Sequence, residues 1–225
     1  MALELDSIVP IGRSLDEYSK MFTLSDRDLK KSILGIGDGP ASFNAELTEL
    51  GGHVTSVDPI YMFSAAQIQS RFYEAIDGVI NQIKNTPADW VWSCHRSPED
   101  LRKNRENVNQ LFLEDFTSDN CSRYVCAELP HLPFKNNHFE LAVCSHLLFL
   151  YSDHLSLDFH LHSILELLRV ADEVRIFPLV TLGHKTSPYL ESIVESLSEK
   201  GYEIQIKKVE YELQKGGNKM MVITR

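Results

Sequence analysis

Hydrophobic residues along the chain alternate between short continuous runs and helical spacing. An apolar run covers 33–36, and the spacing of Phe43, Leu47 and Leu50 then predicts a helix that Gly51 and Gly52 end. The stretch Val54-Thr55-Ser56-Val57 that follows is predicted to be a second strand. The order strand, helix, strand predicts a βαβ unit, in which the two strands run parallel.

The same pattern predicts further elements on both sides of this unit. Before it, Tyr18 and Met21 are among the apolar positions of a predicted helical cover over 1–31. After it, 61–118 is predicted to be a mostly helical insertion, with one helix over 64–83 and another beginning at Ser97 and Pro98.

The second half of the chain repeats strand and helix patterns. Strands are predicted at 123–127, 139–145 and 173–178, helices at 155–170 and 187–200, and a terminal antiparallel pair at 202–211 and 219–224. The fold class is therefore α/β, with a mostly parallel seven-stranded sheet, a C-terminal antiparallel hairpin and a helical insertion after the second strand.

Composition limits the classes of function. The 225 residues are 43% hydrophobic and 24% charged, which fits a single domain over 1–225. The N-terminal residues do not resemble a signal peptide and no run reaches membrane-spanning length, so a cytoplasmic protein with no membrane partner is expected. A net charge of −10 disfavours a nucleic-acid partner, and the cysteine spacing suggests no metal site.

Three glycines at alternate positions follow the first predicted strand. At Gly35, Gly37 and Gly39 the backbone can turn sharply and bring main-chain N–H groups against a ligand. The carboxylate of Asp58 falls at the carboxyl end of the second strand, where doubly wound folds hold ribose hydroxyls.

This glycine turn with an acid about 20 residues later resembles the first motif of the class I S-adenosylmethionine-dependent methyltransferases. Gly35 stands where that family usually has an acid. The resemblance implies a Rossmann-like three-layer sandwich, S-adenosylmethionine as cofactor and S-adenosylhomocysteine as product. It also implies cofactor contacts by Tyr18, by the three glycines, by Asp58 and by Pro59. A nicotinamide site would need a glycine at Pro40.

A second stretch, 127–141, resembles the family's segment before the fourth strand. Aligned on Leu-Pro-Phe at 132–134, Glu128 takes the acid position and Leu129 the next one, so this pair is expected to hold the adenine edge. The fourth strand ends at Ser145 and His146, which the resemblance places beside the methyl donor.

The expected activity is transfer of a methyl group to an oxygen, nitrogen or carbon atom of a small-molecule acceptor. His146 is the candidate base, or else only shapes the pocket. Trp90, Trp92 and His95 of the insertion are expected either to line the acceptor site or to form a packed aromatic cluster. The alternatives are a non-catalytic cofactor-binding protein and a nicotinamide-dependent oxidoreductase.

Overall fold

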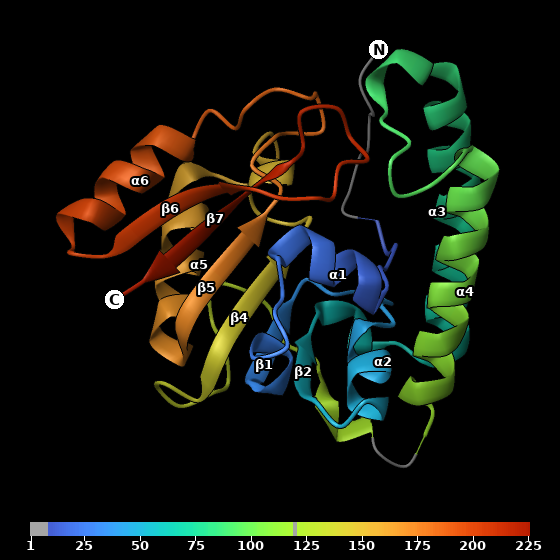
Figure 1. Cartoon of the computed structure of the whole chain (residues 1–225). Helices are drawn as coiled ribbons and strands as arrows, with labels where there is room; N and C mark the ends of the chain where they lie inside the picture. The colour runs from blue at the N-terminus through green and yellow to red at the C-terminus, as the bar shows by residue number, and fades with distance from the viewer. Residues whose placement is uncertain (1–8, 119–120) are drawn as a thin grey trace.

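A computed structural model describes residues 9–118 and 121–225. Its centre is a seven-stranded sheet in the order β3-β2-β1-β4-β5-β7-β6 (Figure 1). The strands are β1 Ser32–Ile36, β2 His53–Val57, β3 Tyr124–Val125, β4 Phe139–Ser145, β5 Ala171–Phe177, β6 Glu203–Lys208 and β7 Lys219–Thr224. Neighbouring strands among β1 to β5 are parallel, and β7 is antiparallel to both β5 and β6. The predicted α/β class and the C-terminal hairpin are confirmed.

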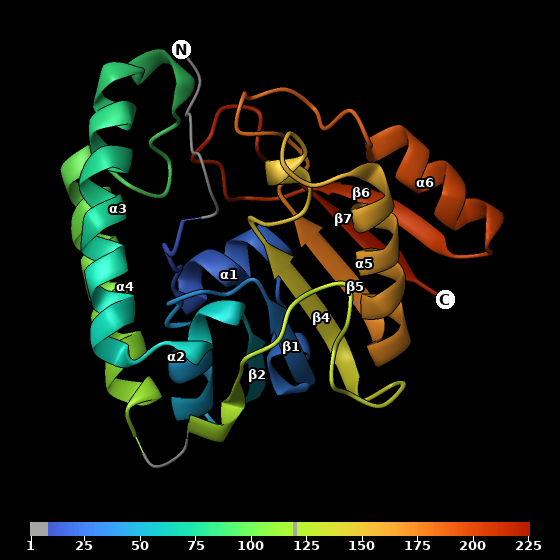
Figure 2. The same ribbon diagram turned by 180° about the vertical axis from the view of Figure 1, so that it is seen from behind.

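Helices cover both faces of the sheet. They are α1 Leu15–Phe22, α2 Phe43–Glu49, α3 Ala65–Asn85, α4 Pro98–Phe116, α5 Leu157–Val170 and α6 Leu190–Glu199. Figures 1 and 2 show α1 and α2 on one face and α5 and α6 on the other. Each face has its own apolar core, one including Phe22 and Phe43 and the other including Ile164 and Leu197. The three-layer sandwich is thereby confirmed.

Side-chain caps set where four of the helices begin, one of them Ser156, which accepts from the Phe159 N–H at α5. Ser14 and Glu17 form a capping box at α1, Ser64 and Gln67 form one at α3, and Ser97 caps α4. The N-terminal helix is shorter than the pattern predicts. It ends at Phe22 because Thr23 adopts a left-handed conformation, and the chain resumes with a single turn of 3₁₀ helix at Asp28–Lys30.

The insertion is a hairpin of two long helices, α3 and α4, that lie side by side in both views. α3 buries one apolar stripe at helical spacing, namely Ile68, Phe72, Ile76, Ile80 and Ile83. Between the helices, Trp90 forms one isolated antiparallel bridge with Gln214. The insertion therefore contacts the segment that follows β6.

The third strand has two residues instead of the predicted five. It pairs with β2 at Tyr124 and Val125, after which the chain turns away and forms a bridge between Glu128 and His131. Glu128 and Leu129 thus follow the strand, as predicted, and do not belong to it. This loop follows the carboxyl end of β3.

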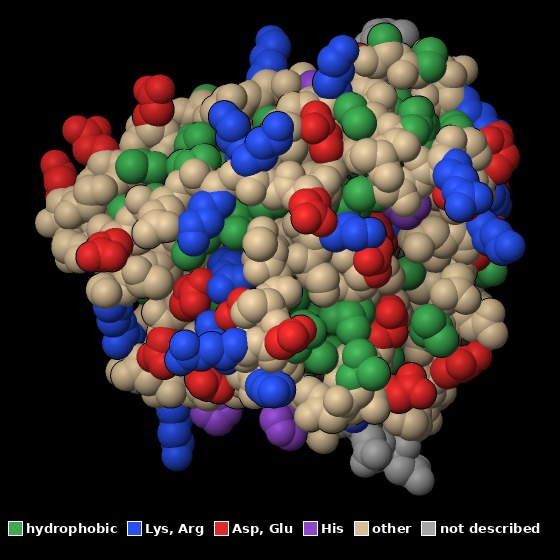
Figure 3. All heavy atoms as spheres, viewed as in Figure 1, with side chains coloured by type: hydrophobic (Ala, Val, Ile, Leu, Met, Phe, Trp, Pro, Cys, Tyr) green, Lys and Arg blue, Asp and Glu red, His purple; other side chains and the backbone are tan. Residues whose placement is uncertain are grey.

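Basic and acidic side chains are mixed on the face shown in Figure 3, which therefore does not gather one sign of charge. Within 9–118 and 121–225, none of the helices is long and apolar enough to cross a membrane.

Candidate functional site

A cavity of about 750 Å³ opens at the carboxyl ends of β1, β2 and β4. This volume is in the range of small-molecule sites, and the position is where doubly wound sheets bind ligands. Its walls are the turn 37–39, the segments 57–60, 127–129 and 145–147, the α3 helix, residues 9–11 and 13, and Leu213 and Gln214. The cavity therefore brings the predicted cofactor motifs and the insertion together.

Two of the predicted glycines form the floor of this cavity. Gly37 and Gly39 have φ angles of 66° and 53°, which non-glycine residues rarely adopt. A Cβ atom on Gly37 would also meet the Leu147 side chain at 3.0 Å. Both positions therefore require glycine and line the cavity, but their N–H groups are already donated, that of Gly37 to the Val57 carbonyl and that of Gly39 to Asp58.

Asp58 ties the glycine turn to the end of β2. Its Oδ2 accepts from the N–H of Gly39 at 2.9 Å, and its Oδ1 accepts from the N–H of Ile60 at 2.8 Å. Burial raises the pKa of Asp58, while these two hydrogen bonds oppose the shift. Each carboxylate oxygen keeps a further lone pair. Asp58 and Pro59 both line the cavity, so Asp58 can still accept from ligand hydroxyls.

The acid absent from position 35 is replaced by Asp38. A Cβ atom on Gly35 would collide with the Asp38 carboxylate, which therefore lies where a side chain at 35 would be. Asp38 is 4% exposed, and it accepts from the hydroxyls of Tyr18 and Ser56, each at 2.6 Å. Burial raises its pKa to about 7, against the effect of both hydrogen bonds.

Two of the predicted cofactor residues do not line the cavity. Gly35 is buried in β1, and Tyr18 lies behind Asp38 with its ring stacked on Phe43 at 4.1 Å. The sequence reasoning missed Asp38, although it is inside the glycine motif. The sequence does carry a signal for it, because the acid that the family usually has at position 35 is absent while position 38 has one.

The predicted adenine pair lies at another wall. Glu128 is exposed and Leu129 is 6% exposed, and both line the cavity with Ala127. No side-chain hydrogen bond within the described residues occupies the Glu128 carboxylate, so it can accept from a ligand. The geometry agrees with reading the edge of a base by one carboxylate and one backbone N–H.

His146 follows β4 in a left-handed conformation, with φ 51°. Its backbone N–H donates to the Phe177 carbonyl at 2.7 Å, and its Nδ1 is 2.9 Å from the Ser145 Oγ. Both residues line the cavity. Burial, with the charges of Arg13 and Arg105, holds the pKa of His146 well below its ordinary value. The imidazole is therefore neutral at neutral pH.

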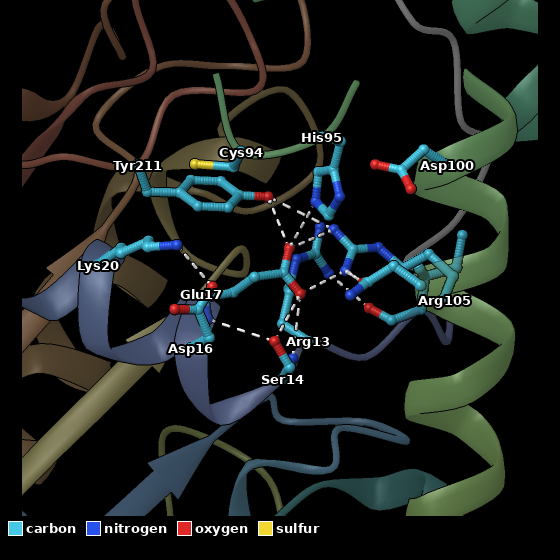
Figure 4. A network of polar contacts seen from close by, with 12 residues as sticks. Arg13, Ser14, Asp16, Glu17, Lys20, Cys94, His95, Asp100, Arg105 and Tyr211 are labelled. Atoms are coloured by element: carbon cyan, nitrogen blue, oxygen red, sulfur yellow. Dashed lines mark hydrogen bonds and ion pairs between the residues drawn. The ribbon is translucent and has the colours of Figure 1, made fainter. Parts of the chain in front are cut away.

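A buried ionic cluster, the Glu17 cluster, is drawn in Figure 4, and the ring centroid of its Tyr211 is 6.4 Å from that of His146. The Glu17 carboxylate accepts two hydrogen bonds from Arg105 at 2.6 and 2.7 Å and one from the Tyr211 hydroxyl at 3.0 Å. His95 Nε2 is 3.2 Å from the same carboxylate. Figure 4 shows these side chains converging from α1, α4, the segment before α4 and the segment after β6. Arg105 strongly favours the ionised form, and the pKa of Glu17 is well below its ordinary value although burial opposes this.

Arg13 belongs to the same region but has no carboxylate partner among the described residues. One Nη1 hydrogen is donated to the Ile11 carbonyl, and the buried Nε has no partner in 9–118 and 121–225. Burial and Arg105 lower its pKa. Within the Glu17 cluster, Arg13 and Arg105 face the single carboxylate of Glu17, and both arginines line the cavity. The sequence reasoning missed both arginines, since neither is in a motif.

The aromatic residues predicted for the acceptor wall separate in the structure. Trp90 lines the cavity, whereas Trp92 packs with the apolar core of α3 and His95 joins the Glu17 cluster. The predicted wall is instead made by Ile76, Val79, Ile80 and Ile83 of α3 and by Leu101 of α4. In the part of the chain that the structure describes, no group of three His, Cys, Asp or Glu side chains could hold a metal ion.

No family model matches the sequence. The chain is 33% identical over 224 residues to the uncharacterized protein MJ0045 of Methanocaldococcus jannaschii, and the match covers 99% of both chains.

Among solved structures, the fold is similar to magnesium protoporphyrin IX methyltransferase of Synechocystis PCC 6803. The crystal structures with bound S-adenosylmethionine and S-adenosylhomocysteine give TM-scores of 0.50 and 0.51 at 13% and 14% identity. Each match covers 94% of this chain, with 77% and 81% of the other chain. At this identity the likeness concerns the fold, which is that of the class I S-adenosylmethionine-dependent methyltransferases.

Proposed function

We propose a methyltransferase activity for this chain, which belongs to the same family as MJ0045 of Methanocaldococcus jannaschii. The reaction is transfer of a methyl group from S-adenosylmethionine to an oxygen, nitrogen or carbon atom of a small molecule. The main observation in support of this proposal is that the glycine turn, Asp58 and the 127–129 loop line the same cavity. The methyltransferase fold, and the cofactor and its product bound in Synechocystis structures of that fold, support it.

The cofactor would lie along the carboxyl edge of the sheet. Asp58 would accept from the ribose hydroxyls, Glu128 and the backbone of Leu129 would bind the adenine edge, and Pro59 would contact its face. Gly37 and Gly39 would let the methionyl part approach their backbone. Each of these contacts uses a group that is open to the cavity.

The methionyl part ends in an ammonium and a carboxylate, and the site offers one charge for each. Burial raises the pKa of Tyr18 most. Asp38 raises it further and Arg13 lowers it, so both charged groups lie near the Tyr18 hydroxyl. A buried carboxylate and an unpaired guanidinium at one end of a cavity fit a zwitterion. Asp38 would then serve the ammonium and Arg13 the carboxylate.

The acceptor would occupy the part of the cavity under the insertion. Most side chains there are apolar, namely Ile11, Ile76, Val79, Ile80, Ile83, Leu101 and Leu213, although Arg71 and Glu74 of α3 also line the cavity. An apolar wall is favourable for a ligand whose own surface is apolar, because both surfaces leave water. The acceptor is therefore a small molecule with an apolar body.

The protein's part in such a reaction is mainly positioning. In-line displacement needs donor carbon and nucleophile held in near-attack geometry, and a base only where the nucleophile loses a proton. Neutral His146, at the end of β4, would accept that proton.

Calorimetric titration with S-adenosylhomocysteine and with NADH tests the cofactor assignment. S-adenosylhomocysteine should bind with 1:1 stoichiometry and NADH should not. Binding of NADH alone would favour the oxidoreductase alternative. Binding of neither ligand would remove the basis of the proposal, because the product of a methyltransferase occupies its cofactor site.

Binding of N-phenyl-1-naphthylamine, a neutral fluorophore, tests the apolar part of the cavity under α3 and α4. It should bind in the presence of S-adenosylhomocysteine, because the two occupy different parts of the cavity. Val79→Glu should weaken it at least about tenfold, since a carboxylate is costly at an apolar wall. Asn81→Glu places the same charge on the exposed side of α3 and should have no effect. Equal affinity of Val79→Glu and Asn81→Glu for the fluorophore would show that it does not bind against this apolar wall.

A further inference from the structure

Strand β6 forms one edge of the sheet, with β7 on one side and no further strand of the described chain on the other (Figure 1). All of its residues except Ile204 are exposed, and Ile206 is 43% exposed although it is a large hydrophobic residue. Such an edge presents a row of backbone N–H and C=O groups to any strand that can pair with it.

The backbone groups that point to the open side of β6 belong to its even-numbered residues. Val209 donates its N–H to the Asn218 carbonyl at 2.9 Å, in the same register as the pairing of β6 with β7. Because backbone groups of successive residues in a strand point to opposite sides, those of Ile204, Ile206 and Lys208 point away from β7. They can pair with another strand without disturbing the hydrogen bonds between β6 and β7.

The side chains along β6 are complementary to a second copy of the same strand. Two-fold symmetry of an antiparallel pair places one residue opposite its own copy, because opposed side chains point to the same face of the sheet. With Gln205 at that position, Glu203 lies opposite Lys207 of the second copy. Ile204 then lies opposite Ile206, and these are the residues whose backbone groups are open. Each pairing occurs twice in the symmetric contact.

Glu203 and Lys207 are free to make this contact. In 9–118 and 121–225, neither side chain takes part in an ion pair or a hydrogen bond. The two are four residues apart on one face of the strand, a separation of about 13 Å, which is too far for them to pair within one chain. A second copy running in the opposite direction brings each of them against the opposite charge.

Lysine on an edge strand ordinarily opposes pairing, and here it selects one register. Moving the symmetric position to Lys207 would place that lysine against its own copy. Moving it to Ile206 would place Glu203 against Val209, and moving it to Ile204 would place Glu203 against Gln205. Of these registers, only the one centred on Gln205 forms the acid–base pairs, and such pairs stabilise neighbouring strands.

We propose that β6 is a self-association surface, on which a second copy of this chain adds its own β6 antiparallel and continues the sheet. The occupant is a second copy and not an unrelated extended peptide, because the charge pattern of the edge is complementary to itself. The contact uses one strand of six residues from each copy, which is small for a protein interface, so the dimer should dissociate on dilution.

Sedimentation velocity over a range of protein concentrations tests the proposal. The wild type should pass from monomer to dimer as its concentration rises toward roughly 0.5 mM. Lys207→Glu should raise the dissociation constant of the dimer at least about tenfold, because it places two acids opposite each other at both symmetric positions. Adding Glu203→Lys reverses each acid–base pair and should restore the dimer. Lys135→Glu makes the same charge change at an exposed position before β4, and it should have no effect.

Amide hydrogen exchange followed by NMR distinguishes pairing of the edge from contact elsewhere. The N–H groups of Ile204 and Ile206 should exchange more slowly as protein concentration rises, whereas that of Val209 should be slow throughout because it is already bonded. A protein that is monomeric at every concentration would overturn the proposal. So would a dimer that Lys207→Glu does not weaken, that the second charge change does not restore, or in which Ile204 and Ile206 gain no protection.

Discussion

The Asp38 carboxylate fills the space that a side chain at residue 35 would need. Gly35 is therefore not a lost functional residue but the partner that makes room for Asp38. The two positions form a pair in which an acid fits at one only if the other has no side chain. The departure from the family motif at 35 thus leaves the local charge in place.

This pairing predicts that Gly35→Ala destabilises the fold. The added methyl group meets the Asp38 carboxylate, which Tyr18 and Ser56 hold in place, so overpacking should cost roughly 1–3 kcal/mol in the free energy of unfolding. Urea unfolding measures this. Gly78→Ala is the matched control, because its Cβ would meet nothing within 4 Å and α3 should gain from alanine.

The double variant Gly35→Asp with Asp38→Gly moves the acid back to position 35. It should recover most of the stability that Gly35→Ala loses and should keep affinity for S-adenosylhomocysteine, because the carboxylate returns to the same region. Additive losses from the two changes would show that the positions are not coupled.

The raised pKa of Asp38 predicts that the stability of the fold depends on pH. Its pKa is raised from 3.8 to about 7 in the fold. Between those values the unfolded chain has lost the proton and the folded chain keeps it, so the contribution of Asp38 to stability falls as pH rises and is constant above about 7. The free energy of unfolding of the wild type minus that of Asp38→Asn should fall by about 1.4 kcal/mol per pH unit in this window. Urea unfolding at pH 4.5, 6 and 7.5 measures it. A flat difference would contradict the raised pKa.

Asp58→Asn should weaken binding of S-adenosylhomocysteine. The amide keeps one acceptor for the Gly39 or Ile60 N–H group but loses the charge that strengthens bonds to ribose hydroxyls. The dissociation constant should rise roughly 10- to 100-fold by calorimetry. Asp26→Asn, at an exposed position, is the control. A change below about twofold would place the ribose elsewhere.

Glu17→Gln should be strongly destabilising. It leaves Arg105, which is 3% exposed, without a buried counter-charge, and breaking one side of a buried pair costs about 3–5 kcal/mol. Chemical denaturation should show this loss, and adding Arg105→Met should restore part of it. Glu99→Gln removes a partner of the exposed Lys84 and should leave stability almost unchanged. Similar losses in both variants would argue against the buried ion pair.

The strands and helices could be predicted from the sequence wherever local pattern decides structure. The β4 range was predicted as 139–145 and is observed as Phe139–Ser145, because a buried strand has a continuous apolar run and a polar turn before it. The β3 strand was predicted too long, because its end depends on the loop that follows and not on its own residues. Asp58 could be placed because it ends a strand next to a glycine turn.

The charged part of the site could not be predicted in the same way. His95 and Trp92 are close to Trp90 in the chain, yet only Trp90 lines the cavity, because burial against α1 and α3 decides their orientation. Arg13 and Arg105 are 92 positions apart in the printed sequence (105 − 13) and meet only through the fold. A single sequence carries no pattern that links such residues.

The Glu17 cluster also makes the insertion an integral part of the protein rather than a detachable module. One carboxylate near the N-terminus is bonded by a side chain of the second inserted helix and by one from the segment between the last two strands. Deleting the helical hairpin would remove the ion-pair partner of Glu17, and deleting the N-terminal cover would remove that of Arg105. Neither segment can be gained, lost or grafted by itself, so the two are expected to be inherited as a unit.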